Sequence, residues 1–221
     1  MDEKELYGVE DSFPENGPSD PASEASEEKK PNRLAMNAFE WLDSIVASVI
    51  LVVLIFTFVF RIVSISGSSM NNTLFDQDRV VIYNLFYEPK VGDIVVISRN
   101  VSNDAEDRAR GKEPIIKRVI AVEGDTVDIQ FEGGVGFVYV NGVLLNEPYI
   151  KEYISENKPI FEAISFPTVV PDGCIFVMGD NRNESLDSRS ALIGNKGMVD
   201  TRYVLGHAVL RVFPFNQVEV L

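Results

Sequence analysis

Two short stretches of this chain carry side chains that could act together in catalysis. The first, Ser66-Gly67-Ser68-Ser69-Met70, holds a candidate serine nucleophile, and the second is Ile115-Ile116-Lys117-Arg118-Val119-Ile120. A serine hydroxyl is a weak nucleophile and needs a neighbouring base. A lysine amine has a solution pKa of about 10.4, so it is protonated at pH 7 and must be neutralised before it can be that base. Together the two stretches indicate a serine protease whose base is a lysine.

The apolar neighbours of Lys117 offer a way to neutralise it. Side chains on a strand alternate between two faces, so Lys117 would share one face with Ile115 and Val119. An inward Lys117 would then lie in apolar surroundings, which disfavour the ammonium form, and Arg118 would point to the other face. The alternative is that Lys117 and Arg118 are two solvated basic residues on an edge strand. The local sequence leaves both possibilities open.

Other common chemistries are excluded or disfavoured by composition. The single histidine, His207, would have to serve any Ser-His-Asp triad, and it lies in the strand-like run Leu205–Leu210, where a structural role is favoured. One histidine and one cysteine, Cys174, cannot build a usual zinc site. The run Asp180–Asn183 lacks the spacing of an EF-hand calcium loop. We therefore expect no metal and no cofactor.

Charge and cysteine content restrict the partners and the environment. The formal net charge is −14 over 221 residues, which argues against nucleic acid as a partner because neutralising phosphates requires a basic face. Residues 1–38 form a polar, largely acidic stretch that cannot bury enough apolar surface to order itself, so a disordered tail is predicted. Cys174 is the only cysteine, so no intramolecular disulfide can form and a hydrophobic core must hold the folded domain together.

A membrane-spanning helix is predicted before the serine stretch. The run from Ile45 to Phe60 has no charged residue, and with Ile62 and Val63 it nearly reaches the twenty residues that a spanning helix needs. We place the transmembrane helix at residues 39–64. The serine stretch follows within a few residues, so its nucleophile would lie at the membrane surface.

Basic residues near the ends of the span predict its orientation. Lys29, Lys30 and Arg33 precede the apolar run, whereas Arg61 alone closely follows it. By the positive-inside rule, the tail at 1–38 is cytoplasmic and residues 65–221 form an extracytoplasmic domain. The chain is therefore expected in the cytoplasmic membrane as a single-pass protein.

The extracytoplasmic region has the pattern of a β domain. Asn141-Gly142 between apolar runs is a strong hairpin signal, and Val101–Pro114 is expected to be a polar surface loop. Without a long helical period after the span, we predict a mostly β fold, an antiparallel, partly closed, barrel-like sheet system. The predicted strands are Arg79–Tyr83, Asp93–Ser98, Ile115–Val122, Thr126–Phe131, Gly136–Val140, Val143–Leu145, Ile175–Met178 and Ala208–Phe213.

Three motifs, in this order along the chain, resemble the conserved boxes of the type I signal peptidases. Ser66–Leu74 resembles their nucleophile box, Lys117–Asp125 their lysine box, and Gly179–Arg189 their third box. Asp78–Val81 and Val91–Val95 are similar to the strands between the first two. The resemblance covers roughly Trp41 to the C-terminus and is closer to the Gram-positive branch.

This resemblance implies roles for individual residues. Ser69 would be the nucleophile and Lys117 the general base, which Ser185 would orient by a hydrogen bond. The backbone of Ser69, with that of Gly67, would serve the oxyanion, and Met70 would lie near the pocket for the small residue before the cut. The remaining supporting residues, which would surround the site with paired charges, are Arg118, Asp180, Arg182, Asp187 and Arg189.

The resemblance also implies an activity. A bacterial type I signal peptidase cleaves signal peptides from exported preproteins after a small-x-small site, with the substrate extended beside Val63–Gly67 and Glu113–Lys117. We expect signal peptides and the lipid bilayer as partners, and a monomer. Two residues depart from the family pattern: Asn72 replaces a proline in the turn after the nucleophile, and Glu184 replaces an asparagine and adds a carboxylate near the site. The alternative is a non-catalytic, membrane-anchored binding protein on the same scaffold.

Overall fold

The first element of the described structure is a single long helix. The computed structural model describes residues 33–98, 114–160 and 162–221, so the predicted loop at Val101–Pro114, apart from Pro114, and most of the predicted tail lie outside the described residues. Helix α1 spans Arg33–Phe58. Its segment Glu40–Thr57 has a mean hydropathy of 2.0 and is long and apolar enough to cross a membrane.

The helix boundaries differ from the prediction at both ends. Helix α1 begins at Arg33, inside the predicted tail, and it ends at Phe58 instead of reaching residue 64. Residues Phe60–Ser64 form strand β1, which pairs antiparallel with the next strand from Phe60↔Tyr83 to Ser64↔Arg79. The last apolar residues of the expected span therefore belong to a strand and not to the helix. The β-branched side chains among them favour this conformation.

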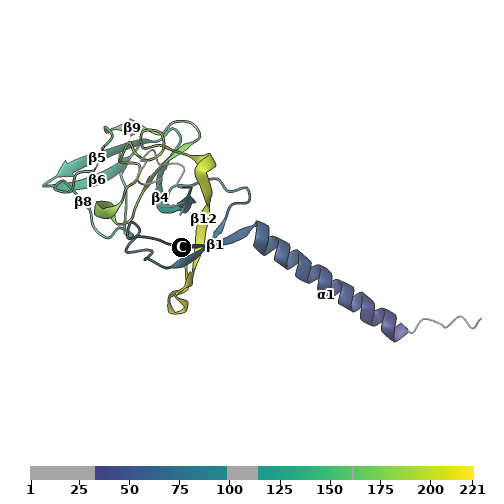
Figure 1. Cartoon of the computed structure of the whole chain (residues 1–221). Helices are drawn as coiled ribbons and strands as arrows, with labels where there is room; N and C mark the ends of the chain where they lie inside the picture. The colour runs from purple at the N-terminus through teal and green to yellow at the C-terminus, as the bar shows by residue number, and fades with distance from the viewer. Residues whose placement is uncertain (1–32, 99–113, 161) are drawn as a thin grey trace, which may run out of the picture. The chain divides into compact units, whose positions relative to one another are not determined.

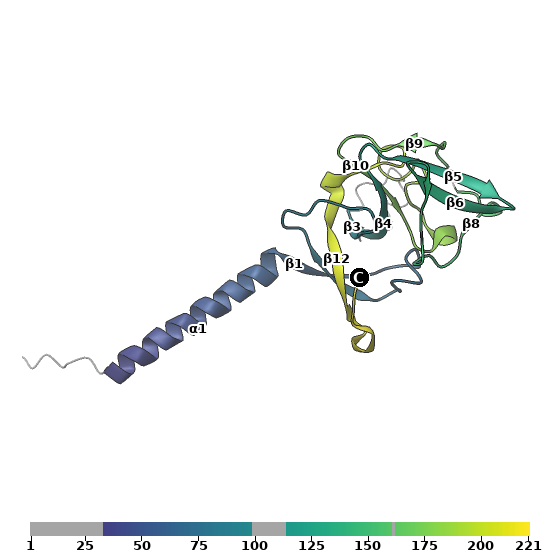
Figure 2. The same cartoon turned by 180° about the vertical axis from the view of Figure 1, so that it is seen from behind.

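Two sheets make up the β domain (Figures 1 and 2). The first has eight strands in the order β1-β2-β12-β3-β4-β10-β11, with β13 beside β12. The bounds of its other strands are β2 Arg79–Tyr83, β3 Ile94–Ile97, β4 Ile115–Val122, β10 Cys174–Met178, β11 Val199–Asp200, β12 Val204–Phe213 and β13 Glu219–Val220.

The second sheet has five strands in the order β7-β6-β5-β9, with β8 beside β6. Every pairing between these named strands is antiparallel, and the two end strands of the larger sheet do not pair with each other. The predicted fold class is therefore confirmed. The strands are β5 Thr126–Glu132, β6 Val135–Val140, β7 Val143–Leu144, β8 Ile154–Ser155 and β9 Thr168–Val169, and short 3-10 helices occur at η2 Arg182–Glu184, η3 Thr201–Tyr203 and η4 Phe215–Gln217.

Strand β4, which carries Lys117, contributes to every part of the core. Ile116 packs in a cluster with β2 and β3, Val119 packs in a second cluster with β3 and β10, and Ile120 packs in a third with the smaller sheet. The residues from Ile116 to Ala121 are all buried. Any side chain on β4 is therefore held by apolar packing on both faces of the strand.

The pairing of β4 leaves part of one edge open. Strand β3 pairs with β4 along its first half, with Val95 opposite Lys117. Strand β10 pairs with β4 only from Arg118 to Val122. Within the described ranges, Ile115–Lys117 therefore has a strand partner on one side alone. A free strand edge is a template for an extended peptide.

The predicted hairpin at Asn141-Gly142 is confirmed. Strands β6 and β7 pair with Val140 opposite Val143, so the loop has two residues. Asn141 has φ 52° and Gly142 has φ 77°, as a turn with two left-handed residues requires. The Asn141 side chain also accepts a hydrogen bond from the Thr126 N–H at 2.9 Å, which ties the turn to β5.

We expect Gly142→Val to destabilise the domain by about 1–2 kcal/mol, because a β-branched residue is unfavourable at a left-handed φ. A downward shift in the thermal unfolding midpoint would be the measurement, with Val143→Thr on the neighbouring exposed position as the control. An unchanged midpoint for Gly142→Val would contradict the hairpin geometry.

Candidate active site

The serine stretch forms a tight turn directly after β1. The Asn71 N–H donates to the Ser68 carbonyl at 3.0 Å, and the Leu74 N–H donates to the Met70 carbonyl at 2.9 Å. Met70 is 1% exposed and anchors the turn in the core beside Leu74. The half-buried Ser69 thus lies between a strand and a buried methionine, on a turn that is fixed on both sides.

Lys117 is buried and reaches Ser69. It is 3% exposed, and its Nζ donates to Ser69 Oγ at 2.7 Å and to the Ile116 carbonyl at 2.9 Å. Ile115 and Val119, which share its face, pack in one apolar cluster. Of the two possibilities that the sequence left open, the inward lysine is therefore the one that occurs.

The third motif closes over the backbone of the serine turn. The Asn181 N–H donates to the Ser69 carbonyl at 3.0 Å, and Asn181 Nδ2 donates to the Ser68 carbonyl at 3.0 Å. A side chain at Gly179 would collide with the Ser69 carbonyl oxygen and with Ser185 Oγ. Glycine at this position therefore permits the close approach between the two motifs.

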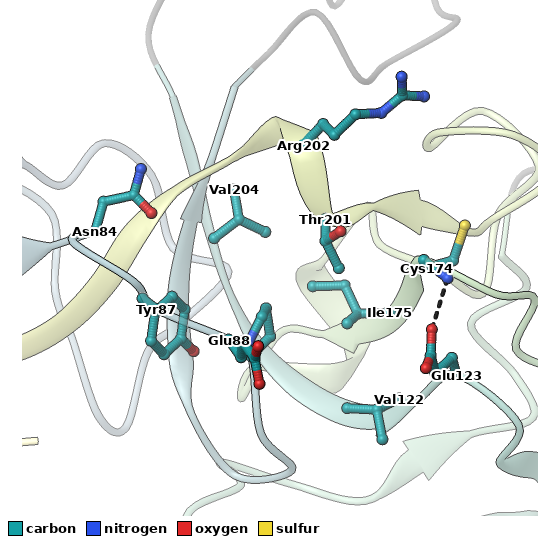
Figure 3. Close-up of a pocket in the computed structure, with 12 residues that line it drawn as sticks. Asn84, Tyr87, Glu88, Val122, Glu123, Cys174, Ile175, Thr201, Arg202 and Val204 are labelled. Atoms are coloured by element: carbon teal, nitrogen blue, oxygen red, sulfur yellow. Dashed lines mark hydrogen bonds between the residues drawn. The ribbon is translucent and has the colours of Figure 1, made fainter.

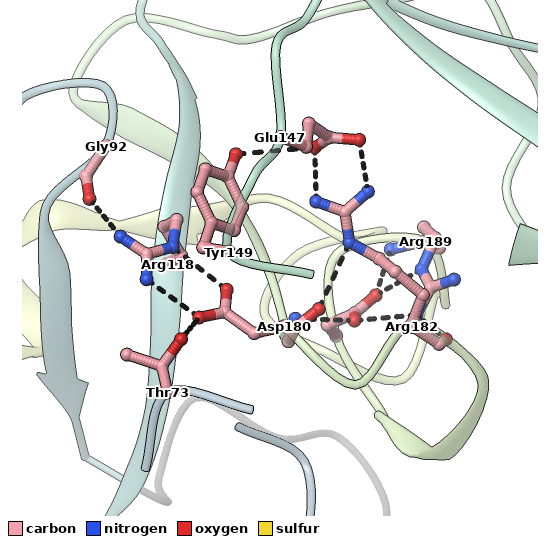
Figure 4. A network of polar contacts seen from close by, with 10 residues as sticks. Thr73, Gly92, Arg118, Glu147, Tyr149, Asp180, Arg182 and Arg189 are labelled. Carbon is pink, nitrogen blue, oxygen red and sulfur yellow. Dashed lines mark hydrogen bonds and ion pairs between the residues drawn. The ribbon is translucent and has the colours of Figure 1, made fainter. Parts of the chain in front are cut away.

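Arg118, which strand alternation places on the face opposite to Lys117, pairs with Asp180. Figure 4 shows this pair. Its Nε and NH2 donate to the two carboxylate oxygens of Asp180 at 2.9 and 2.7 Å. The Tyr149 ring covers the guanidinium, with 4.0 Å from the Arg118 Cζ to the ring centroid. Burial, followed by the charge of Glu147, raises the pKa of Tyr149 to about 12, so its hydroxyl stays protonated. Thr73 Oγ1 also donates to Asp180.

Arg182 has a partner that sequence reasoning missed. Its guanidinium makes a two-pronged ion pair with Glu147, with 2.8 Å from NH1 to Oε2, and its Nε donates to the Gly179 carbonyl at 3.1 Å. Burial opposes the charge, but the hydrogen bonds and the carboxylate of Glu147 outweigh it, so the pKa of Arg182 is raised. Glu147 follows β7 in a loop with no motif of its own, so only the fold reveals its role as this counter-ion.

Asp187 and Arg189 form a third buried ion pair. Arg189 Nε and NH2 donate to the Asp187 carboxylate at 2.7 and 2.8 Å, and the Gly179 N–H donates to it at 3.0 Å. Burial alone would raise the pKa of Asp187. The charge and hydrogen bonds of Arg189 lower this pKa by more than burial raises it, so the carboxylate is ionised. Arg189 NH2 also donates to the Arg182 carbonyl at 2.6 Å, which joins this pair to the second.

Ser185 lacks its expected hydrogen bond, and Gly67 and Met70 make further contacts of their own. Ser185 Oγ does not form the predicted hydrogen bond to Lys117, whose amine donates to Ser69 and Ile116. The Gly67 N–H donates to Asp76 Oδ1 at 2.9 Å and is already occupied. Met70 packs in the core, because its side chain lies on the buried side of the turn.

The two departures from the family pattern also make contacts. Asn72 has φ 101°, and its amide donates to the Tyr149 carbonyl at 2.9 Å, which fastens the turn without a proline. Glu184 is exposed, and its Oε2 accepts from Asn181 Nδ2 at 3.2 Å and from Ser68 Oγ at 3.4 Å. The added carboxylate therefore lies beside the residue that precedes Ser69.

A pocket of ≈ 560 Å³ lies elsewhere in the domain (Figure 3). Its lining includes Val122, Cys174 and Val204 but neither Ser69 nor Lys117. Val122 is five residues along β4 from Lys117, which at the strand rise is about 17 Å. This pocket is therefore separate from the serine and lysine.

The remaining candidates have structural surroundings. His207 stacks on Tyr87 at 5.1 Å between ring centroids, and its Nε2 is 3.8 Å from Asp93 Oδ1. Burial lowers the pKa of His207 more than Asp93 raises it. In the part of the chain that the structure describes, no group of three or more His, Cys, Asp or Glu residues could hold a metal ion.

Comparison with known proteins identifies the family. Residues 38–213 match the family described as signal peptidase, peptidase S26. A signal peptidase I of Bacillus licheniformis is 36% identical over 204 residues, which cover 88% of this chain and 98% of the relative. Signal peptidase I T of Bacillus subtilis (strain 168) is 33% identical over 198 residues, with 87% and 94% covered.

Two further relatives come from other bacteria. A probable signal peptidase I-1 of Synechocystis sp. is 36% identical over 176 residues, covering 78% of this chain and 81% of the relative. A crystal structure of a signal peptidase I from Enterococcus faecalis V583 is 26% identical, covers 56% of this chain and 98% of that chain, and superposes with a TM-score of 0.37. Because the family match spans most of the chain, and because relatives above 30% identity cover over two thirds of it, this chain belongs to the peptidase S26 family of signal peptidases.

Proposed function

We propose that this chain is a membrane-anchored serine endopeptidase that removes N-terminal signal peptides from exported preproteins with a Ser69–Lys117 dyad. The observation that carries the proposal is the 2.7 Å distance between Lys117 Nζ and Ser69 Oγ, in a lysine that is only 3% exposed. The signal peptidase names of the relatives support the substrate class.

In the proposed reaction, the neutral amine of Lys117 accepts the proton of Ser69 while Oγ attacks the scissile carbonyl carbon. The C–N bond then breaks, and Lys117 gives its proton to the leaving amine. Lys117 next takes a proton from a water molecule, which attacks the acyl-serine ester. The signal peptide leaves with a new carboxyl group, and Ser69 recovers its proton.

A neutral Lys117 is the main requirement of this scheme, and its surroundings support it. Taking an amine out of water disfavours its charged form. The cation nearest in sequence, Arg118, points to the opposite face, where Asp180 balances its charge. The Ile116 carbonyl accepts a hydrogen bond from Lys117 Nζ. This bond helps to hold the nitrogen in place beside Ser69.

The backbone N–H of Ser69 is the proposed donor to the oxyanion. Across residues 33–98, 114–160 and 162–221 this N–H has no hydrogen-bond acceptor in the protein, which supports a role in substrate binding. The Gly67 N–H is bound to Asp76, so its participation would require that bond to break. Removal of one oxyanion-hole donor lowers kcat about 10²–10³-fold in a serine protease.

The open edge of β4 is the proposed binding site for the substrate. Ile115–Lys117 pairs only with β3 within the described residues, and this edge ends at the dyad. An extended signal peptide could add there as a strand, between β4 and the segment Val63–Gly67. Glu113, which we also expected beside the substrate, lies outside the described residues. Small residues at the first and third positions before the cut would fit such a close approach.

The proposed setting is the outer face of the cytoplasmic membrane. Helix α1 would be the anchor, with its basic flank on the cytoplasmic side and the β domain outside as a monomer. Phe60 is the first residue after the helix that pairs in a sheet. Only a short connection therefore separates the span from the domain.

Ser69→Ala and Lys117→Met should each lower the rate of preprotein cleavage by about 10²–10⁴-fold or more, because one removes the nucleophile and the other its base. The measurement is cleavage of a preprotein with a small-x-small site by the detergent-solubilised protein. Ser165→Ala and Lys158→Met change the same residue types at exposed positions and should keep the wild-type rate. Cleavage that survives Ser69→Ala would exclude the proposed nucleophile; no cleavage by a folded wild type would favour the binding-protein alternative.

We also propose that Glu147 positions the dyad through Arg182, Gly179 and Asn181. Glu147→Gln leaves the buried Arg182 without its counter-ion, which should cost about 3–5 kcal/mol of folding stability. We expect a lower kcat with a KM close to that of the wild type, because the ion pair acts on the nucleophile's position and not on the substrate.

A second variant separates positioning from stability. Glu147→Leu with Arg182→Met replaces the pair by apolar side chains, which is often neutral for stability. If Glu147 positions the dyad, kcat should stay low in this double variant even where the unfolding midpoint recovers. Recovery of both would show that the pair is only structural, and Glu132→Gln, at an exposed position, is the control.

A further inference from the structure

Around the dyad, the buried arginines and their buried carboxylate partners cancel in pairs. Each of the three buried guanidiniums of the site meets a carboxylate of its own, so this shell adds no net charge. The pairs are Arg118 with Asp180, Arg182 with Glu147, and Arg189 with Asp187. If Lys117 is neutral in the working enzyme, as the proposed function requires, any further charge at the site acts without compensation.

Glu184 is such a charge. Its carboxylate accepts hydrogen bonds from the amide of Asn181 and the hydroxyl of Ser68, and both groups are uncharged. Among the described residues it takes part in no ion pair. The residue is exposed, so the carboxylate is available to a molecule that approaches the serine turn.

The position of the Glu184 carboxylate is fixed relative to the nucleophile. Asn181 is fully buried, and its Nδ2 donates both to Glu184 Oε2 and to the Ser68 carbonyl. Ser68 directly precedes Ser69, and neighbouring Cα atoms are about 3.8 Å apart. A side chain next to the scissile bond would therefore pass within roughly 10 Å of this carboxylate.

The substrate position that can respond to this charge follows from the proposed binding mode. Residues before the cut lie between β4 and Val63–Gly67, and the residue at the cut is small. Glu184 belongs to neither of these segments; it lies in η2, on the third motif. Of the two residues that flank the scissile bond, the one before it is small, so the one after it is the residue that is free to carry a charge.

We infer that Glu184 makes this peptidase selective for charge at the first residue of the mature protein, with lysine or arginine favoured and aspartate or glutamate disfavoured there. The inference rests on the proposed function. At about 10 Å and an effective dielectric constant between about 20 and 80, one unit charge changes the rate roughly 2- to 15-fold.

The test uses three preproteins that differ only in that residue, which is lysine, alanine or aspartate. For the full-length wild type in detergent at low salt (about 20 mM), kcat/KM should be roughly tenfold higher for lysine than for aspartate, with alanine between. In about 1 M salt, where the Debye length is about 3 Å, the ratio should approach one.

Variants at Glu184 supply the decisive comparison. Glu184→Gln should bring the lysine-to-aspartate ratio close to one, and Glu184→Lys should invert it, which a purely structural role would not do. Glu156→Gln removes an exposed carboxylate elsewhere and should keep the wild-type ratio. A wild-type ratio near one, or an unchanged ratio in Glu184→Gln and Glu184→Lys, would overturn the inference.

The alanine preprotein separates this inference from the proposed function. Its cleavage by the wild type, lost in Ser69→Ala, reports the reaction without any charge at the tested position. If that cleavage occurs and the ratio does not depend on Glu184, the inference fails and the peptidase function stands. If that cleavage is absent or survives Ser69→Ala, the proposed function fails, and the inference fails with it.

Discussion

Burial of a lysine amine beside a serine hydroxyl is the constraint on which the rest of this structure depends. Lys117 is 3% exposed and its Nζ is 2.7 Å from Ser69 Oγ, so an amine that would be charged in water is held where charge is disfavoured. Strand β4 makes this possible, because its neighbours Ile116 and Val119 pack in separate apolar clusters on its two faces. Apolar packing thus fixes the amine of Lys117, and a short turn after β1 presents the Ser69 hydroxyl to it.

The buried ion pairs of the site also help to hold Ser69 beside Lys117. A buried ion is costly unless it is paired and hydrogen-bonded, and each guanidinium of the site has a carboxylate partner. Arg182 and Arg189 bind the carbonyls of the third motif, and Asn181 in turn binds the Ser68 and Ser69 carbonyls. Glycine at position 179 lets the two backbones meet. These paired charges surround Ser69 without adding net charge beside the lysine, whereas the exposed carboxylate of Glu184 accepts a hydrogen bond from Ser68 and has no cationic partner among the described residues.

The sequence predicted most of the strands because their signals are local. Alternation around Lys117 predicted which residues share its face, and Asn141-Gly142 predicted the hairpin. Contacts between distant segments were not predictable: Glu147 lies in a loop of ordinary composition, and only the fold brings it to Arg182. Hydropathy alone could not locate the end of helix α1 and the start of strand β1, because the apolar residues there are compatible with a membrane helix and with a buried strand. The expected Ser185–Lys117 bond came from the family resemblance, and Ser185 Oγ does not form it.

In the proposed reaction, Lys117 activates Ser69 for acyl transfer. The most direct measurement is the covalent labelling of the full-length protein by a serine-directed acylating inhibitor, read by intact mass and by mapping of the labelled peptide. We expect one adduct per chain, on the peptide that contains Ser69, and its loss in Lys117→Met while that variant remains folded. An adduct on another serine, or equally fast labelling of Ser69 in Lys117→Met, would contradict it.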